Sequence, residues 1–169
     1  EGREVVKQFV EAGGGYVGIC AGAFLAASNY SWSLGISNHK TFCETIDVSG
    51  IGRKSMWFRG GSAPVTMELT DEGRKILGDF EGVFEVRYQN GPIMSPMGRE
   101  GLGNFRSLSH FRSEVSKYKP QEGTMVNTPA VIVGEYGNGR VLCISPHPES
   151  TDALNRLVQN AVRWTARRR

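Results

Sequence analysis

Long hydrophobic runs are missing from this 169-residue sequence. No apolar stretch approaches the roughly 18 residues that a membrane-spanning helix needs, so no membrane association is expected. A secretory signal-peptide pattern is also missing at the start. The sequence begins at Glu1 without a methionine and enters a helical pattern almost at once. We therefore expect that an upstream segment, with any targeting signal it carried, is not part of this sequence.

Cysteine and histidine are scarce. The three cysteines, Cys20, Cys43 and Cys143, form no CxxC pair, and an odd number leaves at least one thiol unpaired. Free thiols fit a reducing compartment better than a secreted disulfide framework, so a cytoplasmic protein is expected. Cys43, His39 and His110 have no spacing typical of zinc ligands. We expect neither a metal nor a cofactor.

A strong charge of one sign is missing too. The net charge is +3, and the three arginines at the C-terminus supply that much by themselves. No basic face recurs elsewhere, so nucleic acid is not an expected partner. Hydrophobic residues make up 39% and charged residues 22%, which is ordinary for a folded soluble domain. Without repeats or a low-complexity linker, residues 1–169 are predicted to form a single domain.

Helix and strand patterns alternate at both ends of the chain. Helical patterns cover residues 3–12, 21–28 and 152–166, and a short apolar strand pattern covers 16–19. This alternation predicts an α/β fold with a parallel sheet covered on both faces. Thr70 is a predicted helix N-cap, with the helix running to Leu77. Further predicted strands are 45–48, 65–69, 83–88 and the hairpin 130–136 with 140–145, while 95–109 is predicted to be loop.

The segment Gly18-Ile19-Cys20-Ala21-Gly22 lies between a predicted strand and a predicted helix. Only small neighbours allow the chain to reverse so tightly, and the residue at the turn is held in a strained conformation. The helix N-terminus is expected to lower the pKa of the Cys20 thiol, and the Ala21 N–H is expected to bind an oxyanion. The alternative is that Cys20 is a small buried apolar residue.

His147 and Glu149 are two residues apart after the last predicted strand. In an extended segment their side chains point the same way, so the carboxylate can orient the imidazole. Together with Cys20 they form a predicted Cys-His-Glu catalytic set. The alternative for His147 alone is a solvated turn histidine.

The pair of motifs GICAG and SPHPE resembles the class I glutamine amidotransferase superfamily. More narrowly, EAGGGYVGICAGAFLAA, WFRG, YQNGP and YGNGRVLCISPHPE are similar to the domain at the N-terminus of eukaryotic biotin-protein ligases and to standalone bacterial relatives. The resemblance covers nearly the whole chain, and Cys20, His147 and Glu149 match the family triad. It implies a flavodoxin-like three-layer sandwich with a mostly parallel sheet.

The chain departs from that family pattern at its start. About three strand-helix steps that precede the cysteine turn in the family are missing, together with the loop that supplies the second oxyanion donor. We therefore expect an exposed apolar sheet edge where those strands belong, and an N-terminally truncated domain that is inactive or unstable.

Four residues are weaker candidates for substrate binding. The resemblance places the segment with Tyr88, Asn90 and Gly91 near the pocket, where Asn90 would hydrogen-bond a substrate; the alternative is an ordinary turn. Arg59 is a candidate clamp for a substrate carboxylate, and an exposed arginine beside a loop is the alternative.

These residues predict a cysteine-dependent amidase or amidotransferase-like hydrolase. Its substrate would be a small-molecule amide, with glutamine implied by the resemblance, and a synthase or ligase would be its partner. Two rivals remain open. One is a non-catalytic binding or regulatory domain related to the ligase N-terminal domain, and the other is a redox sensor that uses Cys20.

Overall fold

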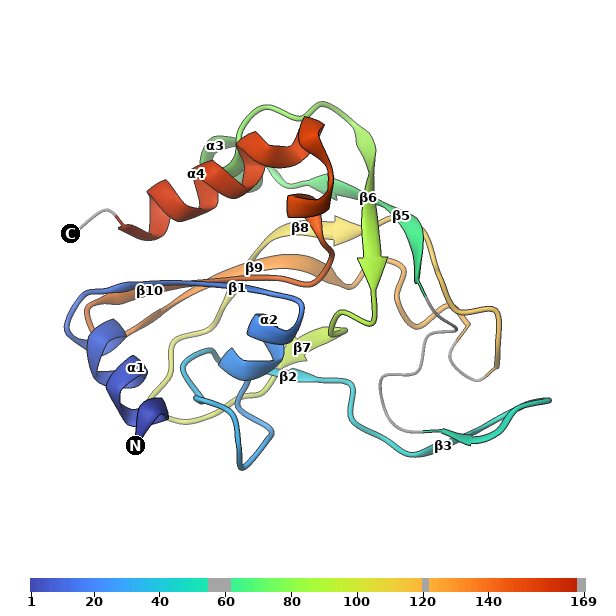
Figure 1. Cartoon of the computed structure of the whole chain (residues 1–169), viewed down its shortest axis with the longest axis horizontal. Coiled ribbons are helices and arrows are strands. Elements are labelled where there is room, and N and C mark those ends of the chain that lie inside the picture. Colours follow the sequence, from blue (N-terminus) through green and yellow to red (C-terminus); the bar gives the residue numbers. More distant parts are fainter. Residues whose placement is uncertain (55–61, 120–121, 167–169) are drawn as a thin grey trace.

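A computed structural model describes residues 1–54, 62–119 and 122–166 of the chain (Figure 1). The α-helices are α1 (Gly2–Glu11), α2 (Ala21–Ala26), α3 (Asp71–Leu77) and α4 (Asn155–Ala166), with 3-10 turns η1 (Pro148–Ser150) and η2 (Asp152–Leu154). The strands are β1 (Gly15–Ile19), β2 (His39–Thr41), β3 (Ile46–Val48), β4 (Gly52–Lys54), β5 (Ser62–Leu69), β6 (Val83–Gln89), β7 (Met94–Pro96), β8 (Arg106–Phe111), β9 (Pro129–Tyr136) and β10 (Gly139–Ile144).

The main sheet is mixed and curled. Its six strands run in the order β1-β10-β9-β8-β5-β6. Only β1 and β10 are parallel, whereas the pairs β10–β9, β9–β8, β8–β5 and β5–β6 are antiparallel. The prediction of a mostly parallel sheet is therefore wrong. A tight hairpin joins β9 to β10, and β5 and β6 run antiparallel although α3 lies between them in sequence. The α/β class is confirmed, and the flavodoxin-like arrangement is not.

Helices cover both faces of the sheet at the β1–β10 end. Figure 1 shows α3 and α4 on one side of β1, β10 and β9, with α1 and α2 on the other. Leu157 and Ala161 of α4 pack into the larger core cluster, and Ala23 and Ala26 of α2 pack into the smaller one. The amphipathic patterns of α1 and α4 thus position β1 and β10, whose ends carry the candidate site.

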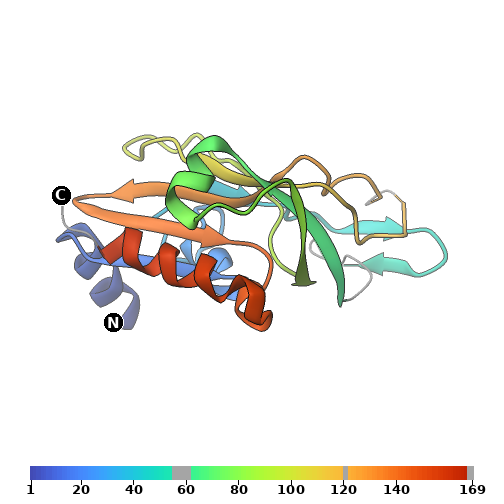
Figure 2. The same cartoon turned by 90° about the horizontal axis from the view of Figure 1, so that it is seen from above.

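Two small sheets lie beside the main one. Strand β2 pairs with β7, and β3 pairs with β4, both antiparallel. The β3–β4 hairpin extends away from the rest of the molecule in both cartoon views (Figures 1 and 2). Strands β7 and β8 fall within or at the edge of the segment 95–109, which was predicted to be loop, so that prediction is wrong for those residues.

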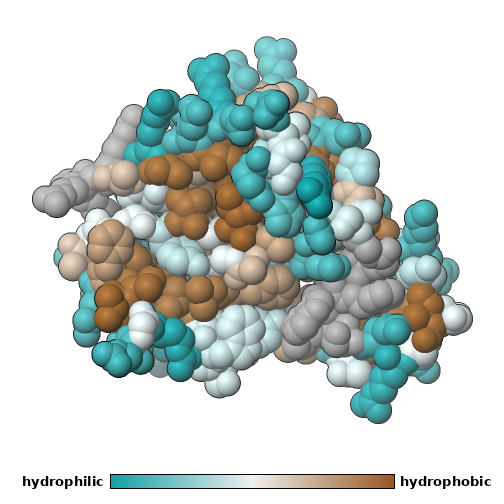
Figure 3. All heavy atoms as spheres, viewed as in Figure 1, coloured by the Kyte–Doolittle hydropathy of each residue, from teal (hydrophilic) through white to brown (hydrophobic). Residues whose placement is uncertain are grey.

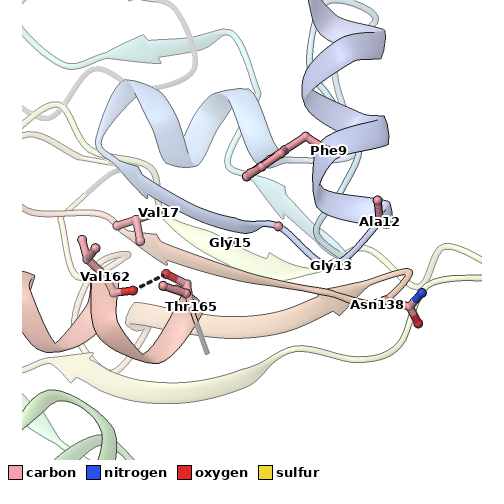
Figure 4. A pocket seen from close by; sticks show the side chains of 10 residues that line it. Phe9, Ala12, Gly13, Gly15, Val17, Asn138, Val162 and Thr165 are labelled. Atoms are coloured by element: carbon pink, nitrogen blue, oxygen red, sulfur yellow. Dashed lines mark hydrogen bonds between the residues drawn. The ribbon is translucent and has the colours of Figure 1, made fainter. Parts of the chain in front are cut away.

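Strand β1 lies at an edge of the main sheet beside an apolar groove. The groove has a volume of about 970 Å³, and none of the described residues that line it is charged. These residues are Phe9, Ala12, Gly13, Gly14, Gly15, Val17, Asn138, Val162, Thr165 and Ala166. Phe9 of α1 and Val162 of α4 border it from opposite sides of β1 (Figure 4). Apolar residues gather on both sides of the hollow (Figure 3). The expected exposed apolar edge is therefore present.

Candidate functional site

Cys20 occupies a sharp turn between β1 and α2. Its backbone has φ 49° and ψ −101°, a conformation that non-glycine residues rarely adopt. Gly18 makes the turn possible, because a Cβ there would lie 2.5 Å from the carbonyl oxygen of Gly22. The prediction that small neighbours surround a strained cysteine is confirmed.

The parallel pairing of β1 with β10 brings Cys20 to the segment that carries His147. Ile19 is paired with Ile144, and the Cys20 amide donates to the Ile144 carbonyl at 2.8 Å. Parallel neighbours end at the same edge of a sheet, so the residues after β10 lie beside the cysteine turn. The amide of His147 donates to the carbonyl of Arg87 at 2.8 Å. This bond joins the end of β6 to the segment that carries His147.

His147 and Glu149 form a close pair. Nδ1 of His147 lies 2.6 Å from Oε1 of Glu149, and the two side chains are 21% and 40% exposed. The contact was expected from an extended segment, but Glu149 lies in the 3-10 turn η1, so a tight turn rather than a strand brings the groups together. With Nδ1 engaged by the carboxylate, Nε2 of a neutral imidazole is a hydrogen-bond acceptor.

The thiol of Cys20 is turned toward β6. Its Sγ donates to the carbonyl oxygen of Gln89 at 3.4 Å, and in the described part of the chain no hydrogen bond joins it to His147. Burial raises the pKa of Cys20, a hydrogen bond from the Ala21 backbone lowers it, and the nearby Glu149 carboxylate raises it. The expected fall in this pKa is wrong, because burial outweighs the Ala21 contact.

Of the predicted substrate-binding residues, the structure describes Tyr88, Asn90 and Gly91. Tyr88 is fully buried and its hydroxyl donates to the Gly91 carbonyl at 2.7 Å, while Asn90 is exposed with φ 52°. These residues form the turn after β6, beside Cys20. Their contact with a substrate stays a prediction. Arg59 lies outside the described residues.

Sequence reasoning missed Gln89. The contact with Cys20 uses the backbone carbonyl of Gln89, so the residue type at this position carries no signal of it. The segment was singled out through its neighbours Tyr88, Asn90 and Gly91. A curled sheet is needed to bring the end of β6 back to the end of β1, and a parallel sheet would not do so.

Cys143 lies where the sequence suggests. It is fully buried in the core, and burial raises its pKa to about 12. Cys43 is exposed, and none of the three cysteines forms a disulfide with another described residue. Within residues 1–54, 62–119 and 122–166, no three His, Cys, Asp or Glu side chains cluster as metal ligands. Among the same residues, no helix is long and apolar enough to cross a bilayer.

Comparison with known proteins identifies the family. The model of the family described as "Biotin-protein ligase, N terminal" matches residues 1–166. This chain belongs to that family. The biotin-protein ligase of Schizosaccharomyces pombe is 22% identical over 150 residues, which cover 85% of this chain and 22% of the ligase. The present chain therefore spans about a fifth of the length of that relative.

Solved structures share the fold at low identity. A β-galactosidase from Bacillus circulans matches with a TM-score of 0.56 and 14% identity over 96% of this chain and 20% of its own. A cytoplasmic protein from Salmonella typhimurium matches with a TM-score of 0.56 and 16% identity over 98% of this chain and 61% of its own. At such identities the likeness concerns the fold alone.

Proposed function

We propose that this chain is a binding or regulatory domain whose ligand lies where Cys20, Gln89 and His147 meet. One observation carries the proposal: the Cys20 thiol donates a hydrogen bond to the Gln89 carbonyl at 3.4 Å, and among the described residues no hydrogen bond joins it to the imidazole. A nucleophilic cysteine must be a thiolate, usually beside a base. A thiol that is half-buried and has a raised pKa is neutral near pH 7.

The groups around the thiol suit a small molecule with an amide. The Ala21 N–H is directed at the sulfur and can donate to a carbonyl oxygen, and the Gln89 carbonyl can accept from an amide N–H. Nε2 of His147 adds a second acceptor when Nδ1–H donates to Glu149. An amide group presents a matching donor and acceptor. Glutamine is therefore the first ligand to test.

Thiol reactivity tests this proposal. Iodoacetamide is added near neutral pH, and peptide mass spectrometry follows Cys20 and the exposed Cys43 in the same sample. We expect Cys20 to react no faster than Cys43, and saturating glutamine to slow Cys20 alone. A rate at Cys20 about tenfold above that of Cys43 would mean an activated thiolate and would overturn the proposal.

Two other observations favour a second candidate, an amide hydrolase or amidotransferase. Cys20 has the strained backbone of a nucleophile turn, with φ 49°, and Nδ1 of His147 lies 2.6 Å from Glu149. In this candidate His147 takes the thiol proton, and the sulfur attacks the amide carbon. The proton then leaves with the departing ammonia, and water hydrolyses the thioester. A synthase or ligase partner would take up the ammonia.

A glutamine-like chloroketone distinguishes this second candidate. The hydrolase requires a single covalent adduct on Cys20, read as intact mass, that is lost in Cys20→Ser and strongly reduced in His147→Ala. Absence of an adduct after prolonged exposure, together with slow alkylation of Cys20, would eliminate the hydrolase. None of the three cysteines forms a disulfide with another described residue, which favours a reducing compartment, and we propose the cytoplasm.

A further inference from the structure

The end of β6 and the turn that follows it, residues 87–91, touch both halves of the candidate site. The Gln89 carbonyl accepts the Cys20 thiol at 3.4 Å, and the Arg87 carbonyl accepts the amide of His147 at 2.8 Å. The side chain of Arg87 also donates to Oε1 of Gln89 at 3.0 Å. A displacement of this turn would therefore change the surroundings of the thiol.

Two buried contacts hold the turn in place. The hydroxyl of the fully buried Tyr88 donates to the Gly91 carbonyl at 2.7 Å. Gly91 also lies directly on Ser145, since a Cβ at this position would be 2.1 Å from the Ser145 carbonyl oxygen and 2.6 Å from its Oγ. Ser145 is fully buried and follows β10, two residues before His147. No larger residue fits at position 91 without moving one of these backbones.

We infer that Tyr88 and Gly91 are positioning residues that keep the Gln89 carbonyl against Cys20 and so hold the thiol in its protonated form. An S–H group can donate to a carbonyl oxygen, whereas a thiolate has no proton to donate and is repelled by the same oxygen. Hydrogen bonding to the neutral form of an acid raises its pKa. The turn thus adds to the effect of burial in setting the pH at which Cys20 becomes reactive.

This inference adds a control element to the proposed function, and it rests on that function only in taking Cys20 as the group that faces the ligand. A ligand that displaces the Gln89 carbonyl would free the thiol. A ligand that leaves the carbonyl in place would keep the thiol neutral. The turn therefore couples occupancy of the site to thiol reactivity.

The test is the pH dependence of Cys20 alkylation in Tyr88→Phe. This variant removes only the hydroxyl. It keeps the ring, which packs edge-on against Phe111 with 5.9 Å between the ring centroids. We expect the midpoint of the rate-against-pH curve to fall. Each half-unit decrease would raise the rate about threefold below the midpoint. Greater exposure of the thiol would also lower the midpoint, because burial raises this pKa, but it would raise the plateau rate as well. A midpoint that falls while the plateau rate stays at the wild-type value therefore separates positioning from loosening.

Gly91→Ala provides a second variant, and Tyr136→Phe is the matched control. The alanine Cβ must push the turn away from Ser145, so the midpoint is expected to fall here as well. Tyr136 lies at the far end of β9, where β10 begins, and its variant should keep the wild-type midpoint. A wild-type midpoint in both Tyr88→Phe and Gly91→Ala, with the variants folded by circular dichroism, overturns the inference.

The two proposals can fail separately. The binding function is judged by the wild-type rate of Cys20 relative to Cys43 and by protection with glutamine. The positioning role is judged by the difference in midpoint between wild type and the two variants. A slow wild-type Cys20 that glutamine does not protect, together with a midpoint that falls in both variants, would reject the binding function and retain the positioning role.

Discussion

The backbone amide of Cys20 donates to the carbonyl of Ile144 at 2.8 Å, which continues the parallel pairing of β1 and β10 by one residue beyond β1. The carbonyl of Cys20 in turn accepts from the amides of Ala23 and Phe24 in α2. Cys20 is thus fixed on its strand side and its helix side at once. Its φ of 49° and ψ of −101° follow from these bonds, and the neighbouring structure maintains the strain.

Replacing Cys20 with glycine should relieve that strain. Such conformations cost about 1–3 kcal/mol for a residue with a Cβ, whereas the added freedom of glycine in the unfolded chain costs about 0.4–1 kcal/mol. We expect the free energy of unfolding of Cys20→Gly to exceed that of Cys20→Ala by about 1 kcal/mol, measured by urea denaturation. Cys20→Ala keeps the Cβ and loses the thiol, so it is the matched control. Equal stabilities would show that the turn is not strained.

Removal of the Glu149 carboxylate should make Cys20 more acidic. Burial is the main cause of the raised pKa of Cys20, and the negative charge of Glu149 adds to it. In Glu149→Gln the midpoint of Cys20 alkylation should therefore move to lower pH, and the rate near neutral pH should rise up to about threefold. The exposed Glu100 offers a control, Glu100→Gln, with no expected change. A slower Cys20 in Glu149→Gln would instead indicate that the pair activates the thiol.

Much of the fold follows from local patterns in the sequence. Gly137 and the runs on either side of it predict the β9–β10 hairpin, and Thr70 caps α3 by accepting from the amide of Gly73 at 3.0 Å. Strand β8 was missed because Ser107, Ser109 and His110 give it a polar pattern, although Ser109 is fully buried. Its position depends on pairing with β5 and β9, which are distant in sequence.

The candidate site was predictable where it depends on residue types and not where it depends on the curl of the sheet. The small residues around Cys20 and the spacing of His147 and Glu149 are visible in the sequence. The sequence does not show that the end of β6 joins the site, because β6 and β1 are at opposite edges of the sheet order. Only the curl brings Gln89 to Cys20, and with it the burial that raises the thiol pKa.

Buried His39 should make stability depend on pH. It is 0% exposed; burial lowers its pKa to about 4, and a hydrogen bond with the Ala23 backbone acts in the opposite direction. In the unfolded chain its pKa is about 6.5, so between pH 6.5 and 4 the unfolded state binds the proton and the folded state does not. The stabilisation is complete above pH 6.5 and decreases by up to about 1.4 kcal/mol per pH unit down to pH 4.

The variant His39→Gln isolates the contribution of His39 to the pH dependence of stability. Urea denaturation at several pH values should give a shallower decrease in the free energy of unfolding between pH 6.5 and 4 than in wild type. The pKa of His110 is also lowered by burial, but His110 is present in both proteins and cancels in the difference. Parallel curves for the two proteins would mean that His39 is protonated without cost in the folded state.

The apolar groove along β1 should bind a hydrophobic dye. Phe9 and Val162 border the groove and are 61% and 50% exposed, which is high for large apolar side chains. Phe9→Lys and Val162→Lys should each reduce the fluorescence of a bound anilinonaphthalene dye by about half, because a charge in the groove opposes burial of the dye. Met97, 41% exposed and outside the groove lining, supplies the control Met97→Lys, which should leave the signal unchanged. Equal dye binding by all four proteins would place the accessible apolar surface elsewhere, and β1 would then be a protected edge despite its position in the sheet.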